Sequence, residues 1–270
     1  MGNYVARIIA IANRKGGSGK TVTAINLAGA LVEAGHQTLA VDLDPQGSLT
    51  RGLGVGQSTP RFSEVLVRGG EGFSDLIQAT HIPNLFVIPA DADLNGIETG
   101  LREVPGRELR LRRCLTKFMS RRFDFILLDC PPSLGALTVN ALVAAGEVIV
   151  PVDCGSYGRD ALASTLSTVD FTREEINYNL RVLGILVCNV NSRTSYDQLA
   201  ESALRQQFGQ LVFEVSIPTS IRIDEAAEAR MPVVFYDPRS SLANRYRDLA
   251  SEVVARGNGI AKPQEGVARG

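Results

Sequence analysis

The sequence of 270 residues lacks long apolar segments, closely spaced cysteine pairs and any large excess of charge of one sign. No apolar run approaches the roughly 18 residues that a transmembrane helix needs. The first residues have neither the charged region, the long apolar core nor the cleavage site of a signal peptide, so we expect a cytoplasmic protein. The four cysteines are far apart and form no Cys-x-x-Cys pair, which argues against a zinc site or an iron–sulfur cluster.

The formal net charge of −1 excludes a broadly basic surface that would attract polyanions from a distance, but it is compatible with a local basic patch. Lysine is scarce, because only four of the 28 basic residues are lysines. Two of them, Lys15 and Lys20, lie in one glycine-rich segment. In a chain that otherwise uses arginine, this pair indicates positions that need a compact ammonium rather than a planar guanidinium.

Short apolar segments alternate with segments of helical periodicity along the chain. The apolar segments are nearly continuous rather than alternating, which is typical of parallel strands buried on both faces. We predict strands over residues 7–12, 38–42, 85–89, 125–129, 147–152, 182–189 and 211–215. We predict helices over residues 20–34, 108–120, 134–145, 158–175, 197–208, 223–230 and 242–255.

This alternation predicts a single doubly wound α/β domain over residues 1–256, with a mostly parallel sheet flanked by helices. The segment 45–81 is rich in glycine and only weakly patterned. Residues 257–270 are polar and contain little to bury, so we expect a disordered tail.

A glycine-rich segment, N-R-K-G-G-S-G-K-T over residues 13–21, follows the first predicted strand and precedes a predicted helix. Strand, glycine loop and helix are the context of a phosphate-binding loop, in which backbone N–H groups and a helix N-terminus surround a polyphosphate. Lys20 would reach the β- and γ-phosphates, and Thr21 would place its hydroxyl on Mg²⁺. The alternative is a strand–helix turn without a ligand. The predicted nucleotide contacts are Lys15, Gly16, Gly17, Ser18, Gly19, Lys20, Thr21 and Val22.

Acidic residues follow or end two of the predicted strands. Asp42 and Asp44 lie two residues apart, so their side chains should project to the same side. Asp129 ends an apolar strand in the manner of a Walker B motif and is expected to bind Mg²⁺ through water, although such an aspartate can also cap a helix. Because the carboxyl ends of the strands meet at the ligand crevice of a doubly wound sheet, we expect these carboxylates near the phosphates.

The loop departs from the usual G-x-x-x-x-G-K-[ST] pattern, since Arg14 replaces a glycine and Lys15 opens the loop. This K-G-G-x-G-K-T form resembles the deviant Walker A loop of the ParA/MinD superfamily of P-loop ATPases. The resemblance implies an ATP-dependent homodimer in which Lys15 reaches the partner's phosphates, whereas the alternative is a solvated loop lysine. It also implies that Asp44 positions the hydrolytic water, and that Asp42 belongs to the shell around Mg²⁺.

Further motifs extend the resemblance to ParA-type partition ATPases from about residue 7 to about residue 252. They are V-D-L-D-P-Q, L-D-C-P-P-S-L-G, I-P-T-S-I-R and V-V-F-Y-D-P-R-S, in this order. The third motif resembles the loop beside the adenine and implies that Pro218 and Ser220 line the base, although many members have asparagine at the second position. Segment 153–159 lacks the glutamate common in the family, so we expect specialised dimer or partner contacts there.

The resemblance also implies binding to DNA without sequence preference once ATP has assembled the dimer. The arginines that it assigns to phosphate contacts are Arg222 and Arg193. Each could instead be a solvated or ion-paired surface residue. A dimer doubles every basic patch, so DNA binding is compatible with the weak net charge of the monomer.

The leading hypothesis is therefore a nucleoid-associated, Mg²⁺-dependent ATPase that a ParB-like partner triggers to hydrolyse ATP and to release DNA. Chromosome or plasmid partition and the positioning of another cargo are all compatible with these motifs. A MinD-like membrane-binding regulator is the alternative, but residues 257–270 offer few large apolar side chains for an amphipathic helix. An ATP-using metabolic or redox enzyme such as the nitrogenase iron protein would need cluster cysteines in a context that the sequence lacks.

Overall fold

The computed structural model describes residues 6–258 except 103, 119–121, 156–157 and 192–193. In this described part, one sheet of seven strands has the order β3-β4-β2-β5-β1-β6-β7. All neighbouring strands are parallel except β3 and β4, which confirms the predicted doubly wound α/β fold. The strands are β1 (Arg7–Ile11), β2 (Thr38–Asp42), β3 (Gln78–Ala79), β4 (Leu85–Ile88), β5 (Phe125–Asp129), β6 (Glu147–Asp153) and β7 (Arg181–Cys188).

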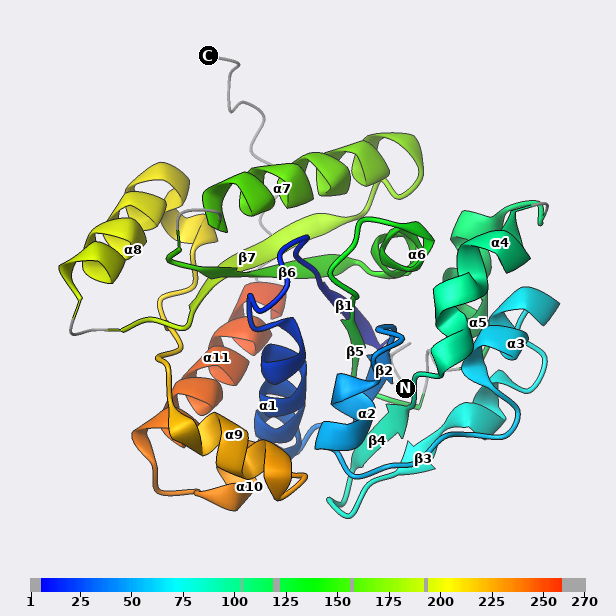
Figure 1. The fold of residues 1–270 in the computed structure, drawn as a ribbon, viewed down its shortest axis with the longest axis horizontal. Helices are drawn as coiled ribbons and strands as arrows, with labels where there is room; N and C mark the ends of the chain where they lie inside the picture. Colours follow the sequence, from blue (N-terminus) through cyan, green and yellow to red (C-terminus); the bar gives the residue numbers. More distant parts are fainter. Residues whose placement is uncertain (1–5, 103, 119–121, 156–157, 192–193, 259–270) are drawn as a thin grey trace.

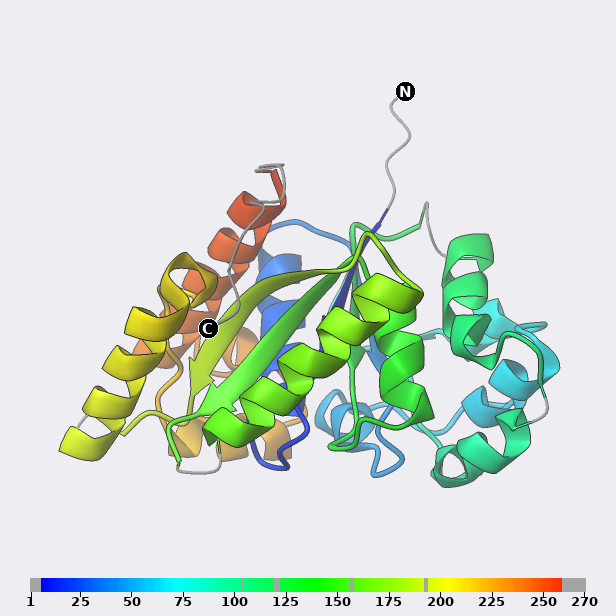
Figure 2. The same cartoon turned by 90° about the horizontal axis from the view of Figure 1, so that it is seen from above.

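Helices cover both faces of the sheet, as Figures 1 and 2 show. Below the sheet in Figure 1 lie α1 (Lys20–Glu33), α2 (Ser48–Gly52), α9 (Ile221–Glu228), α10 (Val233–Tyr236) and α11 (Ser241–Asn258). The remaining helices are α3 (Phe62–Arg68), α4 (Ile97–Leu101), α5 (Arg110–Phe118), α6 (Ala136–Ala144), α7 (Gly158–Glu175) and α8 (Ser195–Phe208). Among the described residues, no helix is both long enough and apolar enough to cross a bilayer.

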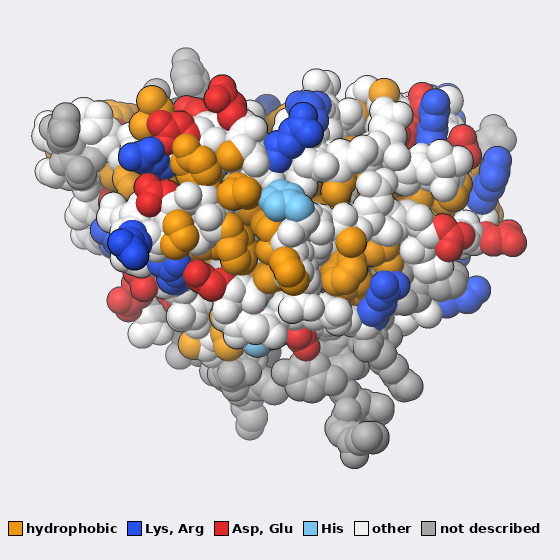
Figure 3. All heavy atoms as spheres, turned by 90° about the horizontal axis from the view of Figure 1, so that it is seen from below, with side chains coloured by type: hydrophobic (Ala, Val, Ile, Leu, Met, Phe, Trp, Pro, Cys, Tyr) orange, Lys and Arg blue, Asp and Glu red, His pale blue; other side chains and the backbone are white. Residues whose placement is uncertain are grey.

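The apolar core is divided by the sheet into two clusters. Successive residues of β1 alternate between them: Ile9 and Ile11 belong to the cluster that contains α1 and α11, and Ala10 belongs to the cluster that contains α5 and α6. This two-sided burial explains why the strands are continuously apolar in the sequence. Figure 3 shows the lower face, where hydrophobic side chains lie among charged ones over the first of these clusters.

The weakly patterned segment 45–81 forms short elements rather than a long helix. It contains α2, α3, the 3-10 turn η1 (Phe73–Leu76) and the two-residue strand β3. Five of its glycines, among them Gly69 and Gly70, have positive φ values. Such positions end helices early, which explains why helical periodicity is faint here.

The predicted strand over residues 211–215 is wrong. The chain makes the 3-10 turn η4 (Gly209–Leu211) and then runs beside the edge strand β7. Its pairing with β7 is reduced to an isolated parallel bridge between Ile185 and Val212. The β-branched and aromatic residues of this segment therefore reflect burial against an edge rather than membership of the ladder.

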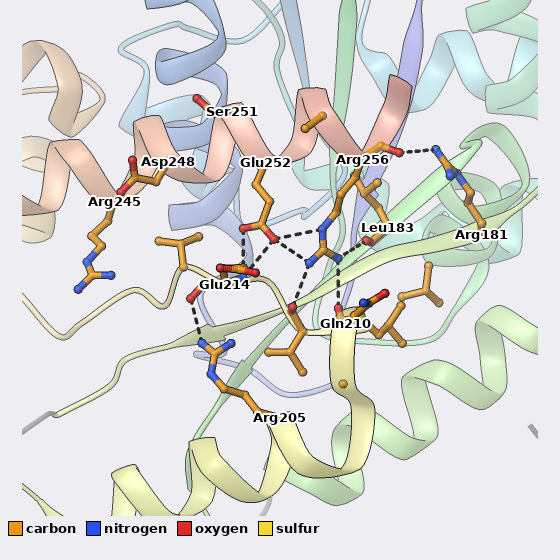
Figure 4. A pocket seen from close by; sticks show the side chains of 16 residues that line it. Arg181, Leu183, Arg205, Gln210, Glu214, Arg245, Asp248, Ser251, Glu252 and Arg256 are labelled. Carbon is orange, nitrogen blue, oxygen red and sulfur yellow. Dashed lines mark hydrogen bonds and ion pairs between the residues drawn. The ribbon is translucent and has the colours of Figure 1, made fainter. Parts of the chain in front are cut away.

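Side chains replace the missing ladder contacts, as Figure 4 shows. The Arg256 guanidinium donates to the carbonyl oxygens of Leu183 at 2.8 Å and Val212 at 2.9 Å. The Glu252 carboxylate accepts from the Arg256 guanidinium at 2.7 Å and from the N–H of Glu214 at 3.1 Å. These contacts hold residues 211–215 against β7. The residues that make them line a surface hollow of about 1380 Å³.

We predict that Arg256→Met lowers the free energy of unfolding by about 1–3 kcal/mol, because it leaves two carbonyl groups without their charged donor. Arg245→Met is the matched control on the same helix, since Arg245 is exposed and has no hydrogen bond or ion pair to the described residues. The control should change stability by less than about 0.5 kcal/mol. Urea unfolding of both variants measures this difference, and equal stabilities would show that Arg256 does not fasten the segment.

Candidate nucleotide site

The glycine loop joins β1 to α1 and borders open space. Gly17 and Gly19 have φ values of +73° and +93°, which residues with a Cβ atom rarely adopt. At Gly19 an added Cβ would also lie 3.3 Å from the side chain of Cys188 on β7. At Gly16 and Gly17 it would meet no described atom within 4 Å. Because the first N–H groups of α1 have no intrahelical acceptors, the loop and the helix end together form an anion site.

The two lysines of the loop occupy different environments. Lys20, the first residue of α1, is only 6% exposed, and its Nζ donates to the carbonyl oxygen of Lys15 at 3.0 Å. Burial lowers the pKa of Lys20, and the negative charge of Asp129 is the largest opposing influence. Lys15 is half-buried, and its Nζ lies 2.7 Å from the carboxylate of Asp153 at the end of β6. Lys20 therefore lies beside the acidic strand ends, whereas Lys15 is held by a neighbouring strand.

The two acidic strand ends meet as the sequence predicts. Asp42 and Asp129 are register partners at the ends of β2 and β5, and both are fully buried. The N–H and hydroxyl groups of Thr50 donate to Oδ2 of Asp42 at 2.8 and 2.6 Å, and the N–H of Asp44 donates to Oδ1 at 3.2 Å. Burial outweighs these bonds and raises the pKa of Asp42 to about 6. The oxygens of Asp42 are thus already engaged by the chain.

Asp129 differs, because neither of its oxygens has a hydrogen-bond partner among the described residues. Burial and, second, the negative charge of Asp42 raise the pKa of Asp129 well above its usual range. An unpaired buried carboxylate is costly, and a bound cation removes that cost. Mg²⁺ typically uses one or two carboxylates and completes its octahedral shell with phosphates and water. Asp129 and the neighbouring half-buried Thr21 therefore fit this ion better than Asp42 does.

Asp44 lies just beyond the buried pair. It is half-buried, and its Oδ1 accepts one bond, from the N–H of Gln46 at 3.0 Å. Ser18, within the loop, is fully buried, and its Oγ has no hydrogen-bond partner in the described part of the chain. In that same part, no group of three or more His, Cys, Asp or Glu residues is arranged to hold a metal ion by itself. The protein side chains therefore suit a metal ion that is also coordinated by phosphate oxygens of a bound nucleotide.

The loop after η4 places the expected adenine contacts at the start of α9. Pro218 is half-buried and forms an isolated bridge with Val190. Ser220 caps α9, because its Oγ accepts from the N–H of Arg222 at 3.2 Å. Ser220 therefore has a structural task at the start of this helix.

Of the two arginines expected to contact DNA, the structure describes only Arg222. The Arg222 side chain is 49% exposed, and its guanidinium lies 2.7 Å from Glu225 and 3.5 Å from Asp237. A DNA phosphate would have to compete with these two carboxylates. Arg193 lies outside the described residues.

The sequence motifs assign no individual role to several residues that support the site. Besides Thr50 and Asp153, Asn13 is 1% exposed, accepts from the N–H of Lys15 at 2.9 Å and donates to the carbonyl oxygen of Pro151 at 2.6 Å. Asn189, with φ +57°, donates to the carbonyl oxygen of Gly17 at 3.1 Å. Thr50 lies in α2, but the others lie at or just after the carboxyl ends of strands, where polar residues gather around ligands, and this position is the signal that the sequence offers.

We predict that Asp129→Asn stabilises the nucleotide-free protein by about 1–3 kcal/mol while it removes Mg²⁺ binding, because it removes an unpaired buried charge. Thermal unfolding between pH 5.5 and pH 8 checks this. A carboxyl whose pKa is raised in the folded state loses stability progressively as the pH rises from its ordinary pKa toward the raised one, so the advantage of the variant should be largest at pH 8 and should shrink toward pH 6. Asp75→Asn, at an exposed aspartate, is the control and should show no such trend.

The chain is similar to known proteins over most of its length. A family model described as an AAA domain matches residues 6–182. The sporulation initiation inhibitor protein Soj of Bacillus subtilis is 40% identical over 255 residues, which are 94% of this chain and 100% of Soj. The chromosome partitioning protein ParA of Caulobacter vibrioides is 39% identical over 252 residues, which are 93% of this chain and 94% of that protein.

A solved structure is also similar to this chain in fold and in sequence. Cobyrinic acid a,c-diamide synthase from Mycobacterium smegmatis, with bound ADP and magnesium, has a TM-score of 0.82 and 33% identity to this chain. The alignment covers 94% of this chain and 96% of that protein. The family model extends over the glycine loop and both acidic strand ends. The chain therefore belongs to the ParA/Soj family of P-loop ATPases, and it uses ATP and Mg²⁺.

Proposed function

We propose that this chain is a partition ATPase whose ATP-bound subunits pair face to face and bind DNA without sequence preference. A ParB-like partner then stimulates hydrolysis and causes release. The observation that carries the proposal is the difference in position between the two loop lysines. Lys20 is buried beside Asp129, whereas Lys15 lies at the rim of the site, where its ammonium can be presented to a second subunit.

Each residue of the site has a task in this proposal. The loop N–H groups and Lys20 bind the phosphates, while Thr21 and Asp129 hold Mg²⁺. ATP and Mg²⁺ supply the reactive phosphorus centre and the neutralising charge. Asp44 orients the attacking water, since its carboxylate has acceptor capacity beyond its bond from Gln46. Lys15 of one subunit stabilises charge on the nucleotide of the other.

The names of the relatives support the cellular part of the proposal. The Caulobacter relative is described as a chromosome partitioning protein, and the match covers nearly the whole of both chains. Co-sedimentation with DNA and with liposomes, each with ATP, with ADP and without nucleotide, tests it directly. ATP-dependent sedimentation with DNA alone supports a DNA-bound dimer. ATP-dependent sedimentation with liposomes would instead favour a membrane-binding regulator.

We predict that Asp44→Ala binds ATP and accumulates as a dimer but hydrolyses ATP on the order of 100-fold more slowly, because the water loses its orienting carboxylate. Sedimentation velocity and phosphate release measure the two properties. Lys20→Ala is the contrasting control and should lose ATP binding, and with it both dimer and hydrolysis. Normal turnover in Asp44→Ala would remove Asp44 from the mechanism.

We predict that Arg222→Ala weakens ATP-dependent binding to DNA of every sequence and flattens the slope of log K against log salt by about one per lost phosphate contact. Glu225→Gln should act in the opposite direction, since it removes a carboxylate that competes for the guanidinium. Arg247→Ala is the matched control, because that arginine pairs with Glu33 at the far end of α1. Unchanged DNA retention in Arg222→Ala would place the patch elsewhere.

A further inference from the structure

Lys15 is held within its own subunit by Asp153. The Nζ atom lies 2.7 Å from both Oδ1 and Oδ2 of the carboxylate, which ends β6 next to β1. The two side chains are 27% and 15% exposed. Such a partly shielded, charge-assisted contact is stronger than a fully solvated surface pair.

The chain is shaped closely around this contact. The N–H of Gly155 donates to Oδ1 of Asp153 at 3.0 Å. A Cβ added at Gly155 would lie 3.0 Å from that oxygen and 3.3 Å from the Nζ of Lys15. A Cβ added at Gly158 would lie 2.3 Å from the carbonyl oxygen of Asp153 and 3.1 Å from its Oδ1. Neither glycine has a positive φ, so the reason for glycine at both positions is space around the aspartate.

The contact competes with the task that the proposed function gives to Lys15. An ammonium that faces both oxygens of Asp153 at 2.7 Å has its charge compensated and at most one N–H donor left for phosphates in a second subunit. Two such contacts, one in each subunit, must weaken or break when a dimer forms. Their strength therefore subtracts from the free energy of dimerisation.

We propose that Asp153 is a positioning residue that retains Lys15 in the free subunit and so opposes dimerisation. This inference rests on the proposed function, specifically on the action of Lys15 across the interface. Asp153 does not touch nucleotide in this mechanism, and its effect on turnover passes through Lys15 alone.

The test is the dimer dissociation constant of Asp153→Asn, measured by sedimentation velocity with saturating Mg²⁺ and a slowly hydrolysed ATP analogue. The asparagine keeps the shape and can still accept from the Gly155 N–H, but it loses the charge that holds Lys15. We expect the dissociation constant to fall about tenfold, which corresponds to ~1.4 kcal/mol. An unchanged or a raised constant would overturn the inference.

A second variant retains the charge. Gly155→Ala crowds both partners of the contact, so it should lower the dissociation constant in the same direction but by less. It carries the test if Asp153→Asn does not fold, which thermal unfolding of the nucleotide-free protein establishes. Tighter dimerisation in neither folded variant would overturn the inference.

Two controls separate the effect of the Lys15–Asp153 contact from other effects. Asp170→Asn removes an equal charge from an exposed site on α7 and should leave the constant unchanged, whereas a tenfold fall there would show a general charge effect and overturn the inference. In a Lys15→Gln background, Asp153→Asn should also have no effect. Lys15→Gln alone should weaken the dimer. If it does not, the proposed role of Lys15 across the interface fails. If Lys15→Gln weakens the dimer but Asp153→Asn in the otherwise unchanged protein has no effect, only the inference about Asp153 fails.

Discussion

The site depends on the charge balance at the ends of β2 and β5. The sheet brings Asp42 and Asp129 into register and buries both, and the nearby Lys20 is itself largely removed from water. Thr50 compensates Asp42 with two bonds, while the oxygens of Asp129 have no partner in the described chain. The sheet can hold this costly arrangement because large apolar clusters on its two faces fix the strand register.

The other parts of the site follow from the same edge of the sheet. Asn13 connects the start of the loop to the end of β6, and Asn189 connects the middle of the loop to the end of β7. The loop is therefore attached to strands on its own sheet rather than left to fluctuate. A site whose donors are placed before the ligand arrives loses less conformational entropy on binding.

The fold and the centre of the site could be predicted because their signals are local. Two-sided burial makes parallel strands continuously apolar, and the loop from Lys15 to Thr21 is one uninterrupted segment. The remainder depends on contacts between distant residues. Lys15 and Asp153 are 138 positions apart, and Thr50 holds Asp42 only because α2 packs beside β2. Residues 211–215 have strand-like composition, but contacts from Arg256 and Glu252 decide their conformation.

The attachment of residues 211–215 to β7 also affects the tendency of the protein to aggregate at high concentration. A parallel sheet ends in two edges with free backbone groups, and such edges invite pairing between molecules. At one edge β3 has only two residues and runs antiparallel, and at the other β7 is covered by a segment whose backbone is bonded to charged side chains. Neither edge offers a long, flat template for another strand. The fold therefore protects the chain against sheet-to-sheet aggregation even at high local concentration.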